Sequence, residues 1–200
     1  MRLSLALVLV LAAAAATATA PATAADVNLN VYPIAGRSMH DSDFWDPVDD
    51  QYALGGTVDF GRATSPLHFA LGLHGSVGDE DILNPLVNKE TANINELSFG
   101  IAKVWTTQGS VRPFVSGGLS FVHAELEFDN NFGSGTVNDD DDSIGVWIEG
   151  GVYWRLTAHF NLGLFGRGLM GTSINLFGED TDADYFEAGP MIGWSWPPKK

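Results

Sequence analysis

The chain has 200 residues, no cysteine and a formal net charge of −15 at pH 7. The absence of cysteine excludes disulfides and thiolate metal sites. The clustered acidic residues exclude nucleic acid as a partner, because a protein that holds phosphates presents a basic surface.

The N-terminal stretch is typical of a secretory signal peptide. Residues 1–25 contain one basic residue, then an apolar run, and end in small residues, which is the pattern that export and cleavage require. A membrane-anchoring helix is the alternative, but such a helix needs about 20 continuous apolar residues. We expect cleavage after Ala24 or Ala25, which leaves residues 26–200 as one mature domain. No cysteine stands at this junction to carry a lipid anchor.

The rest of the chain contains short segments in which apolar and polar residues alternate, bounded by clusters of Gly, Pro, Asn and Asp. Alternation with a period of two predicts β-strands. The predicted strands occupy residues 26–35, 51–61, 67–77, 93–105, 111–127, 143–156, 160–171 and 184–196.

The connections between these strands are alternately long and short. The long ones span residues 36–50, 78–92, 128–142 and 172–183, and the short ones span residues 62–66, 106–110 and 157–159. Eighteen of the 25 acidic residues lie in the long connections or at their borders, and the short connections contain none. Outer-membrane barrels have this layout, with short periplasmic turns and long external loops. The sequence therefore predicts an all-β fold, an eight-stranded antiparallel up-and-down transmembrane β-barrel.

Residue parity assigns each side chain to the lipid or to the lumen. In the stretch GVWIEGGVYWRL the apolar residues share one parity, and Glu149 has the other. A charged side chain on the lipid face at mid-membrane costs up to a few kcal/mol, so Glu149 is expected to point inward. Because the interior of an eight-stranded barrel is just wide enough for side chains to fill, we expect a closed polar interior and no wide pore.

Other ionisable residues share the inward parity and form a predicted interior polar network. Arg167 lies on the strand next to Glu149 at a similar depth, and Glu187 lies one strand further on. We predict that Arg167 bridges Glu149 and Glu187, since such pairing offsets the desolvation of buried charges. The network is completed by Glu96 and His74.

Tryptophans mark the predicted membrane boundary. Four of the six have the outward parity near the short connections: Trp105, Trp154, Trp194 and Trp196. Amphipathic indole rings prefer the headgroup region, so this set predicts an aromatic girdle. A soluble eight-stranded barrel has the opposite polarity, apolar inside and polar outside.

The signal peptide, the four hairpins and segments such as RPFVSGGLSFVHAEL together resemble the small outer-membrane β-barrel proteins of Gram-negative bacteria, the group of OmpX, OmpW, the OmpA transmembrane domain and the opacity proteins. The resemblance covers the whole mature chain. It implies localisation in the cell outer membrane, contact with outer-membrane lipid and lipopolysaccharide, and insertion by the barrel-assembly machinery. Such proteins commonly end in an aromatic residue, whereas this chain continues past Trp196 with residues 197–200. We therefore expect Trp194 and Trp196 to act as the recognised aromatics.

An enzyme is one alternative. Some barrels of this size resemble lipid A deacylases, in which an outward His, a Ser two residues later and a nearby carboxylate attack an ester. Here His123 is followed by Glu125 in place of that Ser, and Ser120 has the inward parity. We therefore expect no catalytic residues and no cofactor.

Acidic runs are the candidate metal sites. Residues 138–143 and 179–184 could offer oxygen ligands to Ca²⁺, with Asp180, Asp182 and Asp184 as the alternating set in the second run. That run lacks the glycine and the distal Glu of an EF-hand loop, and charge runs are usually solvated. We expect no specific metal site, and divalent cations that condense loosely at the acidic loops.

The predicted function is a structural or surface-interaction role through acidic extracellular loops. One alternative, implied by the resemblance to OmpW-like barrels, is a narrow channel for small hydrophobic solutes. A lipid A deacylase-like hydrolase is a less favoured alternative.

Overall fold

The computed structural model describes residues 27–40, 43–62, 65–81, 87–105, 107–130 and 136–196. The expected signal peptide and residues 197–200 lie outside these ranges. None of the described residues forms a helix long and apolar enough to cross a membrane.

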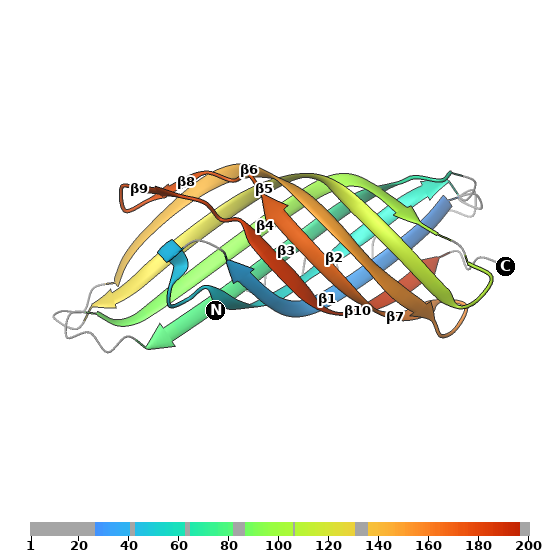
Figure 1. Cartoon of the computed structure of the whole chain (residues 1–200), viewed down its shortest axis with the longest axis horizontal. Helices are drawn as coiled ribbons and strands as arrows, with labels where there is room; N and C mark the ends of the chain where they lie inside the picture. Colours follow the sequence, from blue (N-terminus) through green and yellow to red (C-terminus); the bar gives the residue numbers. More distant parts are fainter. Residues whose placement is uncertain are drawn as a thin grey trace.

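The described chain folds into one barrel of long antiparallel strands (Figure 1). The barrel strands are β1 (Val27–His40), β2 (Asp50–Arg62), β3 (His68–Asp81), β4 (Val87–Val104), β5 (Val111–Asn130), β6 (Thr136–Arg155), β7 (Phe160–Met170) and β10 (Tyr185–Trp196). They close in the order β1-β10-β7-β6-β5-β4-β3-β2. The predicted all-β, eight-stranded antiparallel up-and-down barrel is confirmed.

Three shorter elements lie in the connections at one end of the barrel, which we call the long-loop end. They are the 3₁₀ turn η1 (Asp43–Trp45) and the strands β8 (Ile174–Leu176) and β9 (Glu179–Thr181). β8 and β9 form a separate two-stranded sheet, drawn above the end of β6 in Figure 1. The opposite end carries the tight turns and is called the short-turn end.

Three predicted loops are wrong in their bounds. The loop predicted at 36–50 is shortened because β1 continues to His40. Residues 128–142 were expected to form one long loop, but β5 continues to Asn130 and β6 begins at Thr136, so the acidic run 139–142 lies in a strand. The loop predicted at 78–92 is shortened in the same way by β3 and β4. The acidic run 139–142 pairs residue by residue with β5, as in Leu126↔Asp139 and Ala124↔Asp141. This ladder overrides the low strand propensity of aspartate, because β propensity depends strongly on pairing context.

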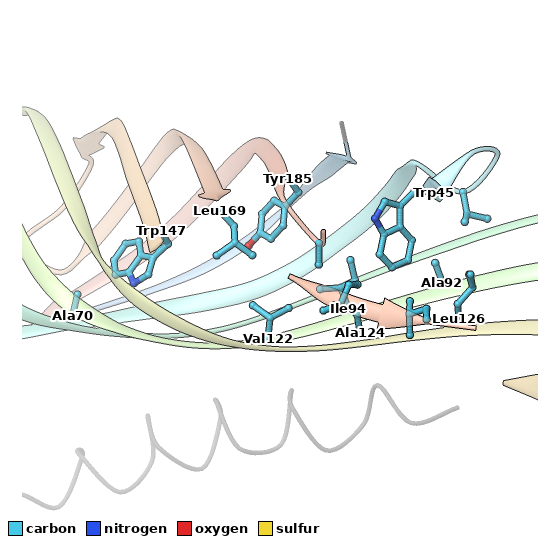
Figure 2. Packing of buried hydrophobic residues seen from close by; sticks show 14 of the residues in the cluster. Trp45, Ala70, Ala92, Ile94, Val122, Ala124, Leu126, Trp147, Leu169 and Tyr185 are labelled. Carbon is cyan, nitrogen blue, oxygen red and sulfur yellow. The ribbon is translucent and has the colours of Figure 1, made fainter. Parts of the chain in front are cut away.

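The lumen is layered along the barrel axis. Near the short-turn end it contains polar contacts such as Asn30 to Asp59 and Asp59 to His68, each 2.7 Å long. The middle contains a charged cluster around Arg167. At the long-loop end the buried side chains are mostly apolar (Figure 2), with a few polar ones such as Gln51 among them. The expectation of a polar interior throughout is therefore wrong for the outer layer, where connecting segments fold over the barrel mouth and bury their own apolar residues. It is also wrong between Arg167 and the short-turn end, where a second buried apolar cluster contains Tyr32, Ile34, Tyr153, Phe165 and Met191.

Candidate functional site

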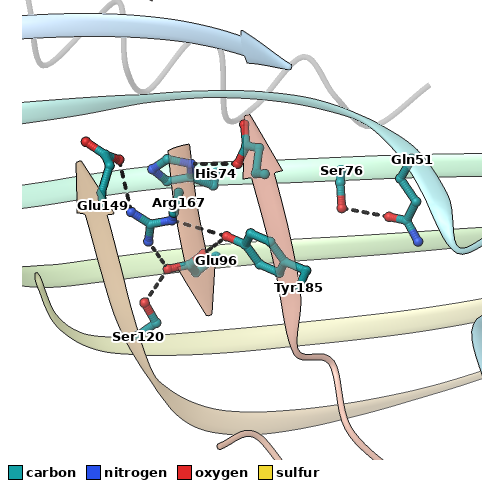
Figure 3. A network of polar contacts seen from close by, with 9 residues as sticks. Gln51, His74, Ser76, Glu96, Ser120, Glu149, Arg167 and Tyr185 are labelled. Atoms are coloured by element: carbon teal, nitrogen blue, oxygen red, sulfur yellow. Dashed lines mark hydrogen bonds and ion pairs between the residues drawn. The ribbon is translucent and has the colours of Figure 1, made fainter. Parts of the chain in front are cut away.

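Arg167 stands at the centre of the lumen, from β7, with its side chain fully buried. Its Nη2 contacts Glu96 of β4, its Nη1 lies 3.3 Å from Glu149 Oε2 of β6, and its Nε donates to the Tyr185 hydroxyl at 3.2 Å (Figure 3). The guanidinium also lies over the Trp147 ring, 4.5 Å from its centroid. We call this set the lumen cluster. Each of the three guanidinium nitrogens has a hydrogen-bond partner, as the burial of a charged group requires.

Glu96 receives more contacts than Arg167 alone provides. The hydroxyls of Ser120 and Tyr185 both donate to its carboxylate. Those donors come from β5 and β10, whereas Glu96 is on β4. The cluster therefore joins opposite walls of the barrel through one carboxylate.

The predicted bridge from Arg167 to Glu187 is wrong. These residues are direct cross-strand partners on β7 and β10, but the guanidinium donors are directed to Glu96, Glu149 and Tyr185. Glu187 instead faces His74 of β3, whose Nδ1 lies 3.6 Å from Glu187 Oε2. Cross-strand adjacency brings two Cα atoms together, but donor geometry decides which carboxylate is bound.

Four apolar side chains from the connecting segments close the lumen above this cluster. Trp45, Val48, Ile174 and Leu176 are almost completely buried there. They share one apolar cluster with inward residues of β4 and β5, namely Ala92, Ile94, Val122, Ala124 and Leu126 (Figure 2). We call this assembly the outer plug. The Trp45 indole Nε1 donates to the Asp182 carbonyl at 2.8 Å, which ties the β1–β2 connection to the β8–β9 segment.

A glycine on β3 makes room for the outer plug. A Cβ at Gly78 would lie 2.9 Å from the Val48 carbonyl oxygen, closer than real Cβ atoms approach. The glycine is required because the backbone of residue 48 passes directly over it.

Two ionisable side chains lie at the edge of the outer plug, beyond the outward apolar side chains of their strands. His40 follows Met39 at the end of β1 and packs 5.3 Å from the Trp45 ring, and its burial lowers its pKa to about 4. Glu90 on β4 is 5% exposed, and its burial, helped by the charge of Asp46, raises its pKa to about 7. Both groups therefore favour their neutral forms while the plug is packed.

The acidic run of β6 divides between two faces. Asp139 and Asp141 have the inward parity and accept hydrogen bonds from the backbone amides of Phe177 at 2.6 Å and Asn175 at 2.7 Å. The bond from the Asn175 amide, with a second one from the Asp142 amide, holds the pKa of the Asp141 carboxyl below its usual range. The β8–β9 hairpin is thus fastened to β6 by side chains, since the two belong to separate sheets.

Asp140 and Asp142 point to the other face of β6, where both are exposed. They are the cross-strand partners of Glu125 and His123 on β5. We call the end of the β5–β6 hairpin (124–130 and 136–143), together with 172–184, the acidic wing. These segments, taken with the tip between them, contain eleven acidic residues and no lysine or arginine.

The weak metal candidates do not converge. Asp180 accepts from Asn175 Nδ2 at 2.7 Å, Asp182 accepts from the amide of Asp184 at 3.2 Å, and Asp184 accepts from the amides of Gly171 and Thr172. Among the described residues no group of three or more His, Asp or Glu side chains is arranged to hold a metal ion. These carboxylates organise the loop backbone.

His123 lies on the outer face of β5, and its Nδ1 is 2.9 Å from Asp142 Oδ1, with both side chains exposed. Ser120 is inside the barrel, bonded to Glu96. That serine is on the opposite face from His123, so the two cannot act on one ester. Glu125 accepts from Asn138 Nδ2 at 3.3 Å.

The outer surface of the barrel carries an apolar belt. Large apolar side chains such as Phe69, Leu97, Phe121, Ile148 and Leu164 are exposed there. The four predicted girdle residues, Trp105, Trp154, Trp194 and Trp196, are all exposed near the short-turn end. Glu149, one residue from Ile148, is buried, so the alternation of faces holds across the charged segment.

The sequence prediction of these sites did not include several of their residues, although parity had already placed Ser120 inside the barrel. Tyr185, Ser120 and Trp147 belong to the lumen cluster, and Asp142 is the partner of His123. The inward parity of Tyr185 and Trp147 was a usable signal. The contact between Trp45 and Asp182 joins segments 137 residues apart and leaves no signal in a single sequence.

A closed eight-stranded barrel with an apolar outer belt and a charged interior defines a transmembrane β-barrel of the outer-membrane type. Over residues 3–194 the sequence matches the family described as outer membrane protein beta-barrel domain, and the chain belongs to that family. Its location is the outer membrane. No curated protein sequence shows significant similarity to it.

Solved structures of small outer-membrane barrels share the fold. Neisserial surface protein A is 12% identical with a TM-score of 0.54, over 84% of this chain and 96% of that one. The N-terminal barrel of Pseudomonas aeruginosa OprF is 16% identical with a TM-score of 0.52, over 84% and 97%. Ail of Yersinia pestis, the attachment invasion locus protein, is 9% identical with a TM-score of 0.52, over 86% and 98%. At these identities the likeness concerns the fold alone.

Proposed function

We propose that this protein is a non-catalytic contact protein of the cell surface, and that the acidic wing is its contact surface. The observation that carries the proposal is the combination of a filled lumen with strands that continue past the apolar belt. In outer-membrane barrels the long loops face outside, so the wing projects from the cell. Within the wing, side-chain bonds from Asp139 and Asp141 brace the β5–β6 hairpin against the β8–β9 hairpin, and a rigid surface loses little conformational entropy on binding.

The negative charge of the acidic wing determines which partners it can attract. The wing has eleven acidic residues and no lysine or arginine of its own, whereas its basic neighbours are Lys89 opposite Asp129 and His123 beside Asp142. This excess of negative charge favours a cationic partner and repels anionic ones. Ail has been solved with a heparin analogue, sucrose octasulfate. A polyanion of that kind is the ligand that this acidic wing would reject.

Charge reversal tests this proposal. Intact Gram-negative cells that display the wild-type protein should bind beads coated with polylysine in a salt-dependent manner. The combined Glu125→Lys and Asp140→Lys variant replaces a directly opposed pair on the exposed face and should lose most of that binding. Gln108→Lys adds a positive charge in a short turn and is the matched control. Equal binding by cells with the charge-reversed wing would refute the proposal.

A narrow channel for small hydrophobic solutes is the second candidate, and the outer plug is the observation that favours it. If the side chain of Trp45 moved aside, the remaining apolar residues of the outer plug would line a path for an apolar molecule. Trp45→Ala should then increase uptake of an apolar fluorescent solute into cells. Unchanged uptake, together with an absence of planar-bilayer conductance, would exclude the channel.

A lipid A deacylase-like hydrolase is the third candidate, and it rests on His123 alone. Mass spectrometry of lipid A from expressing cells should show no lighter species. A lighter species that disappears in His123→Ala would contradict the non-catalytic assignment.

We propose three further kinds of partner, as expected for an outer-membrane barrel. Outer-membrane lipid and lipopolysaccharide would surround the apolar belt. The barrel-assembly machinery would insert the chain, with Trp194 and Trp196 as the recognised aromatics. Divalent cations would condense loosely on the acidic wing without a specific site, and calorimetry that detected a stoichiometric calcium site would contradict this expectation.

A further inference from the structure

The tip of the β8–β9 hairpin holds an aromatic residue in an unfavourable backbone conformation. Phe177 has φ 54° and Gly178 has φ 83°. These two residues form the turn between β8 and β9, and two-residue hairpin turns with positive φ at both positions favour Asn, Asp or Gly. A bulky residue with positive φ is an outlier. Asparagine would make the same turn at lower cost, so the turn itself does not explain the phenyl ring.

The ring belongs to a small apolar patch at the edge of the outer plug, in which Phe128 is half-buried against the plug and the other members are exposed. It lies 5.3 Å from the Phe128 ring of β5, and Phe128 is the direct cross-strand partner of Val137 on β6, which places those two side chains on one face. Phe177 is 41% exposed and Val137 is 52% exposed. We call these three residues the Phe177 patch.

The patch is not part of the lipid-facing belt. On β6 the outward apolar side chains share the parity of Ile144 and Ile148, whereas Val137 has the lumen-facing parity and lies seven residues beyond Ile144. The patch therefore lies above the barrel mouth, exposed to water. Aromatic side chains are enriched at the cores of protein interfaces, so the exposed Phe177 ring is a candidate contact point.

Acidic residues flank the patch. Asp139 lies two residues from Val137 on the same face and binds the amide of Phe177, and Glu179 lies two residues from Phe177. Asp129 follows Phe128 but points to the opposite face of β5, where Lys89 is its cross-strand partner. Residues 124–143 and 172–184 contain no basic residue. An aromatic group with an acidic rim complements an apolar side chain flanked by Lys or Arg.

We propose that the Phe177 patch docks a cationic amphipathic polypeptide segment, whose apolar side chain covers Phe177 and Val137 while its basic side chains reach the acidic rim. This inference rests on the proposed contact function of the acidic wing and adds a specific apolar anchor to it. Anchors of this kind, aromatic and central within a polar rim, carry most of the affinity of protein interfaces.

The test compares two labelled synthetic peptides of equal length and charge, one alternating Lys with Leu and the other Lys with Ser. Fluorescence anisotropy measures their binding to the protein in nanodiscs of zwitterionic lipid, and binding to empty nanodiscs is subtracted. The wild-type protein should bind the Lys–Leu peptide at least about tenfold more tightly, the effect expected from burying one large apolar side chain.

Phe177→Asn is the decisive variant, because asparagine suits the positive φ and leaves the turn intact. It should reduce affinity for the Lys–Leu peptide about tenfold and leave the Lys–Ser peptide unaffected. Phe177→Tyr should keep the affinity within about threefold, since a ring remains. Leu156→Asn, at an exposed apolar position near the short-turn end, is the matched control and should change neither affinity.

The outcomes separate this inference from the proposed function. If both peptides bind equally, or if Phe177→Asn leaves the Lys–Leu affinity unchanged, the docking site is refuted and the acidic contact surface stands. If neither peptide binds above the empty nanodiscs, both proposals fail.

Discussion

Removal of the central guanidinium should be the most damaging single change inside the barrel. In Arg167→Met the side chain keeps similar length and remains able to pack on the Trp147 ring, but Glu96 and Glu149 lose their shared cation. The side chains of these two carboxylates are 1% and 5% exposed, so solvent cannot replace the lost contacts. Breaking a buried ion pair by removing one partner costs about 3–5 kcal/mol, which shifts the folding equilibrium by a factor of a hundred or more.

Two variants isolate the cause of this loss. Glu149→Gln keeps a polar side chain beside Arg167 and should destabilise the barrel less than Arg167→Met. The triple variant Arg167→Met, Glu96→Gln, Glu149→Gln leaves no unpaired charge among these three positions and should recover much of the stability, because neutral replacement of a complete buried pair is often tolerated.

The assay is urea-induced unfolding of the protein in lipid vesicles, followed by the difference in electrophoretic migration between folded and boiled barrel. Arg167→Met should unfold at a clearly lower urea concentration than the wild type. A loss below about 1 kcal/mol, well under the cost of an unpaired buried charge, would refute the reasoning. So would a triple variant no more stable than the single one.

Three further predictions concern the long-loop end and the C-terminus. Because burial raises the pKa of Glu90 from 4.5 to about 7, the contribution of Glu90 to packing of the outer plug is fully present below pH 4.5 and is lost as the pH rises through 7. Hydrogen exchange of the Trp45 amide, corrected for its intrinsic rate, should therefore become faster across this pH range. Glu90→Gln should abolish the change. Asp184→Ala removes the acceptor for the amides of Gly171 and Thr172 and should speed protease cleavage within residues 172–183, whereas Asp140→Ala should not. Deletion of residues 197–200 should leave membrane insertion and heat-dependent migration unchanged, since β10 ends at Trp196, and failed assembly would contradict the role assigned to Trp194 and Trp196.

The barrel was predictable because its two environments impose a period of two on every strand. Ile148 and Glu149 illustrate this, since one is exposed on the outer face and the other is buried. The same rule placed Glu96, Arg167 and Glu187 inside. Parity carries no information about rotamers, however, so it could not show that Arg167 would bind Glu96 while Glu187 faced His74.

The long-loop end was less predictable for a different reason. Its aspartates read as loop residues, because aspartate is rare in strands. Their strand conformation depends on pairing with β5 and on the amides of Asn175 and Phe177, which are distant in sequence. The outer plug depends likewise on Trp45 and Leu176, which reach the lumen only through the fold of their connecting segments.

The layering of the lumen places two unlike barriers in series along the barrel axis. A hydrated ion that approached from the long-loop end would have to shed its water shell among apolar side chains before any carboxylate could compensate for the loss. An apolar molecule that crossed the first layer would next encounter the ion pairs of Arg167, where it would have to displace contacts that it cannot replace. Each of these two layers therefore opposes the kind of solute that the other would tolerate.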